Sequence, residues 1–535
     1  MFRSAPIIET PAGWWNSRWF LALLVVIAII PLILPTVPPL TDLPEHMGRY
    51  RIMLADGSDP LRRDYFSFEW GFIANLGVDL LVIPLAPLFG LELAVKLIVI
   101  GIAALTASGI LWIAHEAHGR VPPTTILALS LAYSFPFIWG FVNFLLSMAL
   151  ALNAFALWLR LGRQGRWRLR IALFVPIGLL LTVAHIFGWA VLSLLAFAAE
   201  TVRMRDSGRT IAQSIWHGGL ACLALAPPVL LMVLWRTGDA RGANTGWFDW
   251  HAKYVYALSA LRNTWMTVDL GTVYLLFCVI VFGLFGLWLR MNRTLGIATV
   301  MLITAYILLP RMLFGSAYAD MRLAPYLFVV ALAALALKSG SRREAAIVAG
   351  IATAIFVGRI ALLTRSFAAQ SHANEQQLQA LDHVRPGSRV FVQVALRCTA
   401  YWVTSRMDHL GAMAIVRRGA FVNGQWTDPG AQLVRIKYAP AKGFAEDPTE
   451  ILRPAGCRQR HAKRYPDALN TLPRDAFDYA WVVNWPRARW NSFPGLVPIW
   501  TGEGRGILYR VIPPQANSAT RPSDTPTGSR PRTAA

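Results

Sequence analysis

The stretch TDLPEHMGRYRIM gathers the side chains of this sequence whose types could do chemistry together. Asp42 and Glu45 bring carboxylates, His46 brings an imidazole, and Arg49 adds a guanidinium group. Pro44 stiffens the chain, so the acids and the imidazole could turn inward as a group. A carboxylate at a half-dry surface has a raised proton affinity, which suits a general base. The pattern therefore indicates a catalytic carboxylate.

The same residues allow two other interpretations. They could be ordinary solvated charges of a helix N-terminus, paired within their own loop. Asp42, Glu45 and His46 could also hold a divalent metal ion, although no HxxE-type spacing supports one. Which of the three interpretations applies depends on the side of a membrane that the stretch faces, and therefore on the topology of the chain.

The composition is that of a polytopic membrane protein. Of the 535 residues, 55% are hydrophobic and 15% are charged, and the mean hydropathy is +0.45. An ordinary soluble domain is roughly a quarter charged. The net charge of +22 could suggest a nucleic-acid partner, but many arginines lie in short gaps between apolar runs. That placement is typical of cytoplasmic loops, so we expect no nucleic-acid binding.

The apolar runs predict eleven transmembrane helices, with the N-terminus in the cytoplasm and the C-terminus outside. The first run is long for a signal peptide and is read as an uncleaved helix. The segment Asn75–Phe89 is broken by Pro84 and Pro87, and counting it as a span would export a loop of five arginines. We therefore predict an interfacial or re-entrant helix within a first periplasmic loop, residues 36–90. The expected spans are 19–35, 91–114, 124–138, 141–160, 171–184, 186–200, 214–235, 269–290, 295–313, 322–337 and 344–363.

After this transmembrane domain, residues 1–364, the sequence becomes polar enough for a small periplasmic α/β domain, residues 365–512. Residues 513–535 are rich in Pro, Ser and Thr and are expected to be disordered. Cys398 and Cys457 are the only cysteines of the polar region and are a disulfide candidate if it is exported. Strands are expected at 389–395, 433–438, 479–485 and 507–512, and helices at 373–384 and 409–416.

The positive-inside rule does not explain the charged groups expected at the outer side. Arginine side chains bind phosphate oxygens in pairs, and three of them are expected there, at positions 311, 322 and 359. Together with the acid cluster, they favour a lipid-phosphate-linked substrate whose head group lies at the outer surface. Arg311 and Arg322 could instead reach lipid head groups or pair with Asp320 to brace a loop. His185, at a predicted turn, could be a packed, hydrogen-bonded residue.

The layout resembles the GT-C glycosyltransferases, which include protein mannosyltransferases that use dolichyl-phosphate-mannose and aminoarabinose transferases that act on lipid A. The resemblance implies that Asp42 matches the essential Asp of the first outer loop and that Glu45 stands near the second acid. The stretch from Asn75 resembles a family segment that contains the sequence Leu-Phe-Gly followed by an Arg. Here Leu88-Phe89-Gly90 matches the Leu-Phe-Gly, and Lys96 lies near the position of the Arg. The usual adjacent Asp-Glu pair is split here by Leu-Pro, and the Pro-Pro-Leu-Tyr-Tyr signature is absent.

By this resemblance, we expect a glycosyltransferase of the bacterial inner membrane that moves a sugar from a polyprenyl-phosphate donor at the periplasmic face, by inversion. The acceptor would be a lipid, a glycan or a protein. Asp42 would be the base, and Glu45 and His46 would orient it or bind the acceptor. Substrate-binding candidates are Arg49, His185, Arg311, Asp320, Arg322 and Arg359. A non-catalytic polymer-assembly subunit and a lipid or glycan transporter are the alternatives; a transporter would place charges near mid-membrane.

Overall fold

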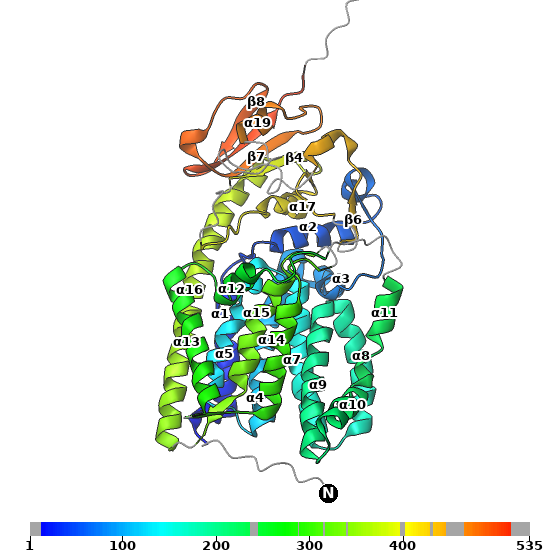
Figure 1. Cartoon of the computed structure of the whole chain (residues 1–535). Helices are drawn as coiled ribbons and strands as arrows, with labels where there is room; N and C mark the ends of the chain where they lie inside the picture. The colour runs from blue at the N-terminus through cyan, green and yellow to red at the C-terminus, as the bar shows by residue number, and fades with distance from the viewer. Residues whose placement is uncertain are drawn as a thin grey trace, which may run out of the picture.

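The computed structural model describes residues 12–235, 244–286, 288–313, 316–338, 341–395, 402–427, 432–445 and 465–514. A bundle of long helices carries a small sheet domain stacked on one of its ends (Figure 1). The predicted fold class is thus confirmed. The predicted disulfide between Cys398 and Cys457 and the predicted disordered tail from residue 515 lie outside the described residues.

Each expected span coincides with one helix or with a row of shorter helices. The continuous ones are α1 (Arg18–Ile33), α4 (Leu91–His118), α7 (Val142–Arg163), α8 (Trp167–Ala184), α9 (Ile186–Asp206), α13 (Met266–Phe285), α14 (Arg293–Leu308), α15 (Ala319–Ala333) and α16 (Arg342–Leu378). The third expected span is divided into α5 (Thr125–Ala128), the 3₁₀ helix η3 (Leu129–Tyr133) and α6 (Phe135–Trp139). The seventh is divided into α10 (Ile211–Ala221) and α11 (Pro228–Trp235).

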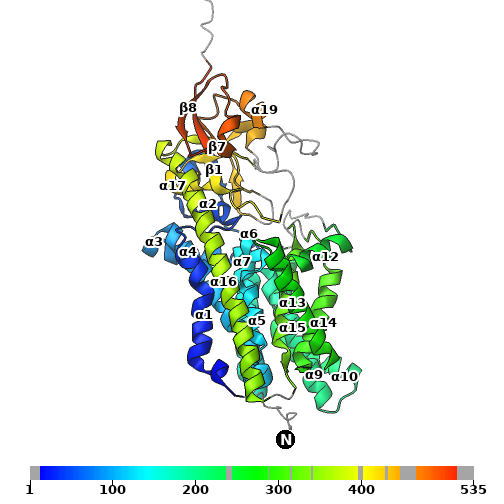
Figure 2. The ribbon, with the colours of Figure 1, turned by 90° about the vertical axis from the view of Figure 1, so that its left-hand side faces the viewer.

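By length and composition, six helices in the described part could cross a membrane, or seven if the bent pair from Ile211 to Val233 is one span. The remaining expected spans are shorter helices. α16 runs from the bundle far into the sheet domain as one element, across the boundary expected at residue 364 (Figure 2).

Residues 36–90, predicted to lie outside and called the first outer loop below, form two helices at the end of the bundle that carries the sheet domain, which is called the outer end. These are α2 (Leu43–Leu54) and α3 (Gly77–Phe89) (Figure 1). α3 has 13 residues, so it is about 20 Å long and too short to cross a hydrocarbon core of about 30 Å. It exposes apolar side chains such as Leu80, Ile83 and Leu88 and buries Asp79. These features are those of the interfacial helix expected from the sequence.

The opposite end of the bundle holds the arginine-rich loops. Arg170 and Arg203 both pair with Glu200, the former at 2.6 Å, and Arg163 lies 2.5 Å from Glu116. In Figure 1 the connection between α9 and α10 lies at the end of the bundle away from the sheet. At the ends of two expected spans, β2 (Leu289–Met291) and β3 (Leu335–Leu337) pair as short antiparallel strands, which the sequence reading did not foresee.

The sheet of the C-terminal domain has five strands in the order β5-β4-β7-β9-β8. β4 is parallel to β5 and β7, and β9 is antiparallel to β7 and β8. The expected strands at 389, 479 and 507 are present, whereas β5 and β8 were not anticipated. The bounds are β4 (Arg389–Val394), β5 (Phe421–Val422), β7 (Tyr479–Pro486), β8 (Leu496–Thr501) and β9 (Arg505–Val511).

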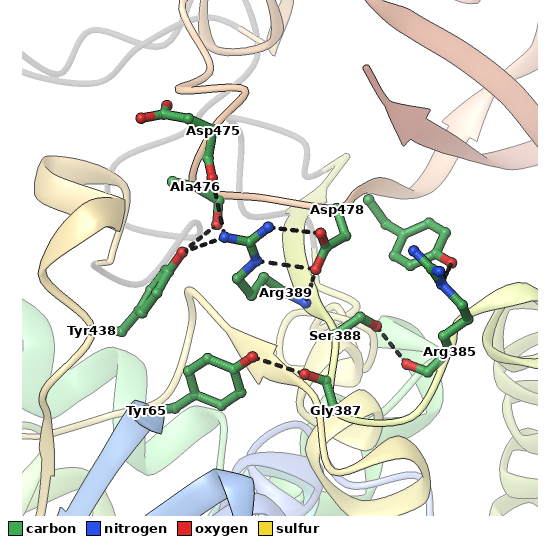
Figure 3. A network of polar contacts seen from close by, with 10 residues as sticks. Tyr65, Arg385, Gly387, Ser388, Arg389, Tyr438, Asp475, Ala476 and Asp478 are labelled. Carbon is green, nitrogen blue, oxygen red and sulfur yellow. Dashed lines mark hydrogen bonds and ion pairs between the residues drawn. The ribbon is translucent and has the colours of Figure 1, made fainter. Parts of the chain in front are cut away.

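The fourth expected strand, β6 (Val434–Ile436), lies outside this sheet and pairs with β1 (Phe66–Phe68) of the first outer loop. A polar network lies next to this pairing (Figure 3). Tyr65 donates a hydrogen bond to the carbonyl of Gly387 at 2.7 Å. Arg389 pairs with Asp478 at 2.7 Å and donates to the Tyr438 hydroxyl at 3.0 Å. The first outer loop and the C-terminal domain are therefore packed as one unit.

Candidate active site under the C-terminal domain

α2 lies across the outer end of the bundle and places the acid cluster there. Asp42 immediately precedes the helix, and its backbone N–H donates to the carbonyl of Trp139 at 2.8 Å. Gly140, with φ +91°, permits this close approach, because a Cβ at that position would lie 3.3 Å from the Asp42 nitrogen. Glu45 lies in the first turn, where a helix favours negative charge.

Both carboxylates are buried. Asp42 is 3% exposed and Glu45 2% exposed. The interpretation of the stretch as a loop of ordinary solvated charges is therefore wrong. Burial of two acids only three positions apart is costly unless the surroundings stabilise them.

The C-terminal domain supplies part of those surroundings, which the sequence reading missed. The imidazole of His409 lies between the acids, with Nε2 3.7 Å from Asp42 Oδ1 and Nδ1 3.8 Å from Glu45 Oε2. The backbone N–H of Trp426 donates to Glu45 Oε1 at 2.6 Å. In the sequence, His409 showed only as the first residue of an expected helix, 409–416.

His46 lies beside this cluster and is buried. Its ring is 6.4 Å from Tyr50 and 5.9 Å from Trp426, measured between centroids. Burial lowers the pKa of His46 well below its usual value, and the nearby Arg49, His409 and Arg322 lower it further. His46 is therefore a neutral imidazole at neutral pH and can orient a partner without adding charge.

Arg49, expected to bind substrate, instead forms a buried ion pair. It donates to Asp79 at 2.9 Å and to Gln432. Asn143 also donates to Asp79, at 3.0 Å. Burial disfavours the charge of Arg49, but Asp79 outweighs that cost, so the pKa of Arg49 lies above its usual value. This network links α2 to α3 and α7.

Arg322 on α15 reaches the acid cluster from far along the chain. Its guanidinium lies 4.2 Å from the ring centroid of Phe141 and 6.0 Å from that of Phe144. It is close enough to act electrostatically on Asp42 and His46. It makes no ion pair within the described part of the chain, and its buried Nε has no hydrogen-bond partner there. Arg322 is therefore placed to bind an anion next to Asp42.

A row of aromatic rings connects Arg311 to Arg322. Its guanidinium lies 5.4 Å from the ring centroid of Tyr318. Tyr318 lies 5.5 Å from Trp139, which stacks on Phe141 at 5.9 Å. The row thus leads from one arginine to the aromatic ring under the other.

The other candidates have structural partners. Arg359 pairs with Asp269 at 2.7 Å, and Asp320 lies 3.5 Å from Lys253. His185 accepts a hydrogen bond from the backbone N–H of Phe187 at 3.3 Å, which caps α9. This contact matches the interpretation of His185 as a packed residue, although it also lies within electrostatic range of Arg322.

One hollow lies against Glu45, and a larger one lies between helix ends of the bundle. One, of about 10 Å³, is lined by Glu45, Asp408 and His409 and is roughly the smallest space that holds a water molecule. The other, of about 480 Å³, lies at the outer ends of α1, α3 and α4 and is lined by Leu34, Phe89, Glu92 and Lys96 among others. In the described residues, no group of three or more His, Cys, Asp or Glu side chains is arranged to hold a metal ion.

No protein-family model and no curated protein matches the chain. Among solved structures, it is similar to two crystal structures of ArnT from Cupriavidus metallidurans, one bound to undecaprenyl phosphate and one in the apo state. The first shares 13% sequence identity at a TM-score of 0.47, and the match covers 92% of this chain and 97% of that chain. The second shares 12% identity at the same TM-score and coverage. At these values, function has to be inferred from the site itself.

Proposed function

We propose that this chain is a membrane glycosyltransferase of the GT-C kind, which moves a sugar from a polyprenyl-phosphate donor to an acceptor hydroxyl. One observation carries the proposal: buried Asp42 of the first outer loop lies within electrostatic range of Arg322, a guanidinium without an ion pair in the described residues, at the outer end of the bundle. A general base beside an anion-binding group is what direct displacement of a phosphate requires.

In the proposed reaction, the carboxylate of Asp42 takes the proton of the acceptor hydroxyl. The acceptor oxygen attacks the anomeric carbon of the donor while the bond from that carbon to the phosphate oxygen breaks. The electron pair of that bond leaves with the phosphate, whose charge Arg322 stabilises. A single displacement of this kind inverts the anomeric centre.

The remaining groups have supporting roles in this proposal. Glu45 is held by the N–H of Trp426 and lies beside Asp42 on the first turn of α2. It would fix the orientation of the base. Neutral His46 would contact the acceptor, and Arg311 would bind a more distant oxygen of the donor. Arg359 is bound to Asp269 and would contribute only if that ion pair opened.

We place the reaction at the periplasmic face of a bacterial inner membrane, with a cytoplasmic N-terminus. The arginine-rich loops lie at one end of the bundle and the acid cluster at the other, which supports this orientation under the positive-inside rule (Figure 1). Its partners would be the polyprenyl-phosphate sugar and a lipid, glycan or protein acceptor.

Purified protein with radiolabelled polyprenyl-phosphate sugars tests the proposal. The wild type should transfer label, and Asp42→Asn should lower turnover by about 10² to 10⁴-fold, the usual contribution of a general base. Asp64→Asn is the matched control, because this acid of the same loop is exposed and pairs only with Arg63 within the described residues. Near-normal transfer by Asp42→Asn would remove Asp42 from the mechanism. Absence of transfer, with lipid movement across proteoliposomes, would instead favour the transporter.

A further inference from the structure

His409 has an unusual position for a residue of a C-terminal domain. Its two ring nitrogens face two different carboxylates of the first outer loop, at 3.7 Å and 3.8 Å. It is 8% exposed, and its ring packs edge-on against Trp426 with 4.6 Å between centroids. Among the described residues, Asp408 lines the same small hollow, and His46, on which Arg322 also acts, lies within electrostatic range of His409.

Close packing fixes this position. His409 precedes the 3₁₀ helix η6 (Leu410–Ala412), which leads into α17 (Met413–Arg418) on top of α2. A Cβ on Gly411 would lie 2.5 Å from Val392 of β4, and a Cβ on Gly48 of α2 would lie 2.6 Å from the side chain of Gln425. The same Cβ on Gly48 would lie 3.3 Å from Ile415 and 3.4 Å from Ala412, so the segment that carries His409 touches both the sheet and α2, and Gly411 has no room for an added methyl group.

Electrostatics gives the imidazole a task at this place. Two carboxylates that share a buried site oppose each other's ionisation, and a cation between them relieves that opposition. A base can accept a proton only if it is ionised beforehand. The distances are longer than hydrogen bonds, as is common for catalytic contacts before substrate binds.

We propose that His409 is a positioning residue for the reaction, which keeps Asp42 and Glu45 ionised and aligned, so that the catalytic site is complete only with the C-terminal domain seated on α2. This inference rests on the proposed glycosyl transfer. It assigns to the domain a part in the chemistry beyond covering the membrane domain.

The pH dependence of transfer tests it. Without the imidazole, Asp42 would bind its proton at a higher pH, so in His409→Gln the acidic limb of the kcat/KM profile should move up by about one pH unit or more. Activity below that limb should fall about tenfold, with the donor KM within about twofold of wild type. His409→Lys should bring the limb back toward the wild-type pH. His383→Gln, at an exposed histidine of the same domain, is the control. An unchanged profile in His409→Gln would overturn the proposal.

A second measurement needs no activity. If His409 interacts with the acids, His409→Gln should lower the Tm less in a Glu45→Gln background than in wild type. Strictly additive Tm losses would contradict the contact. A wild type that transfers no sugar would refute the proposed function, whereas additive losses or an unchanged pH profile in an active enzyme would refute the role of His409 alone.

Discussion

Arg322 and Arg359 are the same residue type at the outer end of the bundle, yet their surroundings give them different tasks. Arg359 is bound to Asp269, which also accepts a hydrogen bond from Trp402 at 2.7 Å. Arg322 rests on Phe141 and has no ion pair among the described residues. Removing either one should therefore change a different property of the protein.

We expect Arg322→Gln to lower kcat/KM for the donor by about 10-fold to 100-fold, because a hydrogen bond to a charged group is worth about 1.5–3 kcal/mol. Its Tm should stay near that of wild type. Arg359→Gln should lower the Tm instead, since it leaves Asp269 buried without its cation, at a cost of about 3–5 kcal/mol. Transfer kinetics and thermal unfolding in detergent measure both. Equal behaviour of the two variants would contradict the assignment.

His46 gives a pH-dependent prediction for stability. Its pKa is lowered in the folded protein, chiefly by burial and then by Arg49, whereas the unfolded chain has the ordinary value of about 6.5. Below that pH the unfolded state binds the proton more tightly, so stability falls as the pH drops. His46→Gln cannot bind this proton, and its Tm should fall less between pH 7 and pH 5, measured as a difference from wild type at each pH. Parallel Tm curves would contradict a buried neutral imidazole.

At the scale of elements, the site depends on how α2 is held above the bundle. The pair of Arg49 and Asp79 joins α2 to α3, and Asn143 joins the same carboxylate to α7. Both charged side chains are almost completely buried, at 3% and 4% exposure. A buried ion pair contributes little net stability, but loss of one partner is costly because the other charge remains.

Arg49→Met should therefore destabilise the protein by about 3–5 kcal/mol, and Arg49→Met combined with Asp79→Asn should destabilise it less than Arg49→Met alone. Thermal unfolding of the three proteins measures this. Arg51→Met is a control, because Arg51 pairs with Asp59 in a half-exposed position. A double variant less stable than the single one would mean that the two side chains do not act as a pair.

The sequence predicted the positions of helices and strands better than it predicted which of them pack together. The length of the apolar runs located the helices. The two prolines, and the five arginines that a further span would export, predicted that α3 is not a span, and its 13 residues agree with this. The strand-like run at 433–438 indicated β6, but such a run does not say which strand it pairs with. β6 pairs with β1, which lies some 370 positions earlier in the chain. His409 was missed for the same reason. Nothing local connects it to Asp42, and only the seating of the C-terminal domain on α2 brings them together.

At the scale of the whole molecule, charge is divided between the two ends of the bundle. Arg163, Arg170 and Arg203 lie at one end with Glu116 and Glu200, and the acid cluster lies at the other under the sheet domain (Figure 1). The ion pair between Arg417 of α17 and Glu92 of α4, at 2.9 Å, fastens the domain to the bundle at the outer end. Under the proposed function, the orientation of the bundle in the membrane decides which leaflet supplies the donor.

Reporter fusions test that orientation. Alkaline phosphatase is active only when exported, so a fusion after Pro514 should be active and a fusion after Gln164, in the arginine-rich loop between α7 and α8, should be inactive. Immunoblots of both fusions control for expression. The physical reason is that exporting the arginines of that loop opposes the positive-inside rule, whereas the first outer loop carries no such excess. The reverse pattern would place Asp42 and Arg322 at the cytoplasmic surface, and the donor would then have to present its phosphate from the inner leaflet.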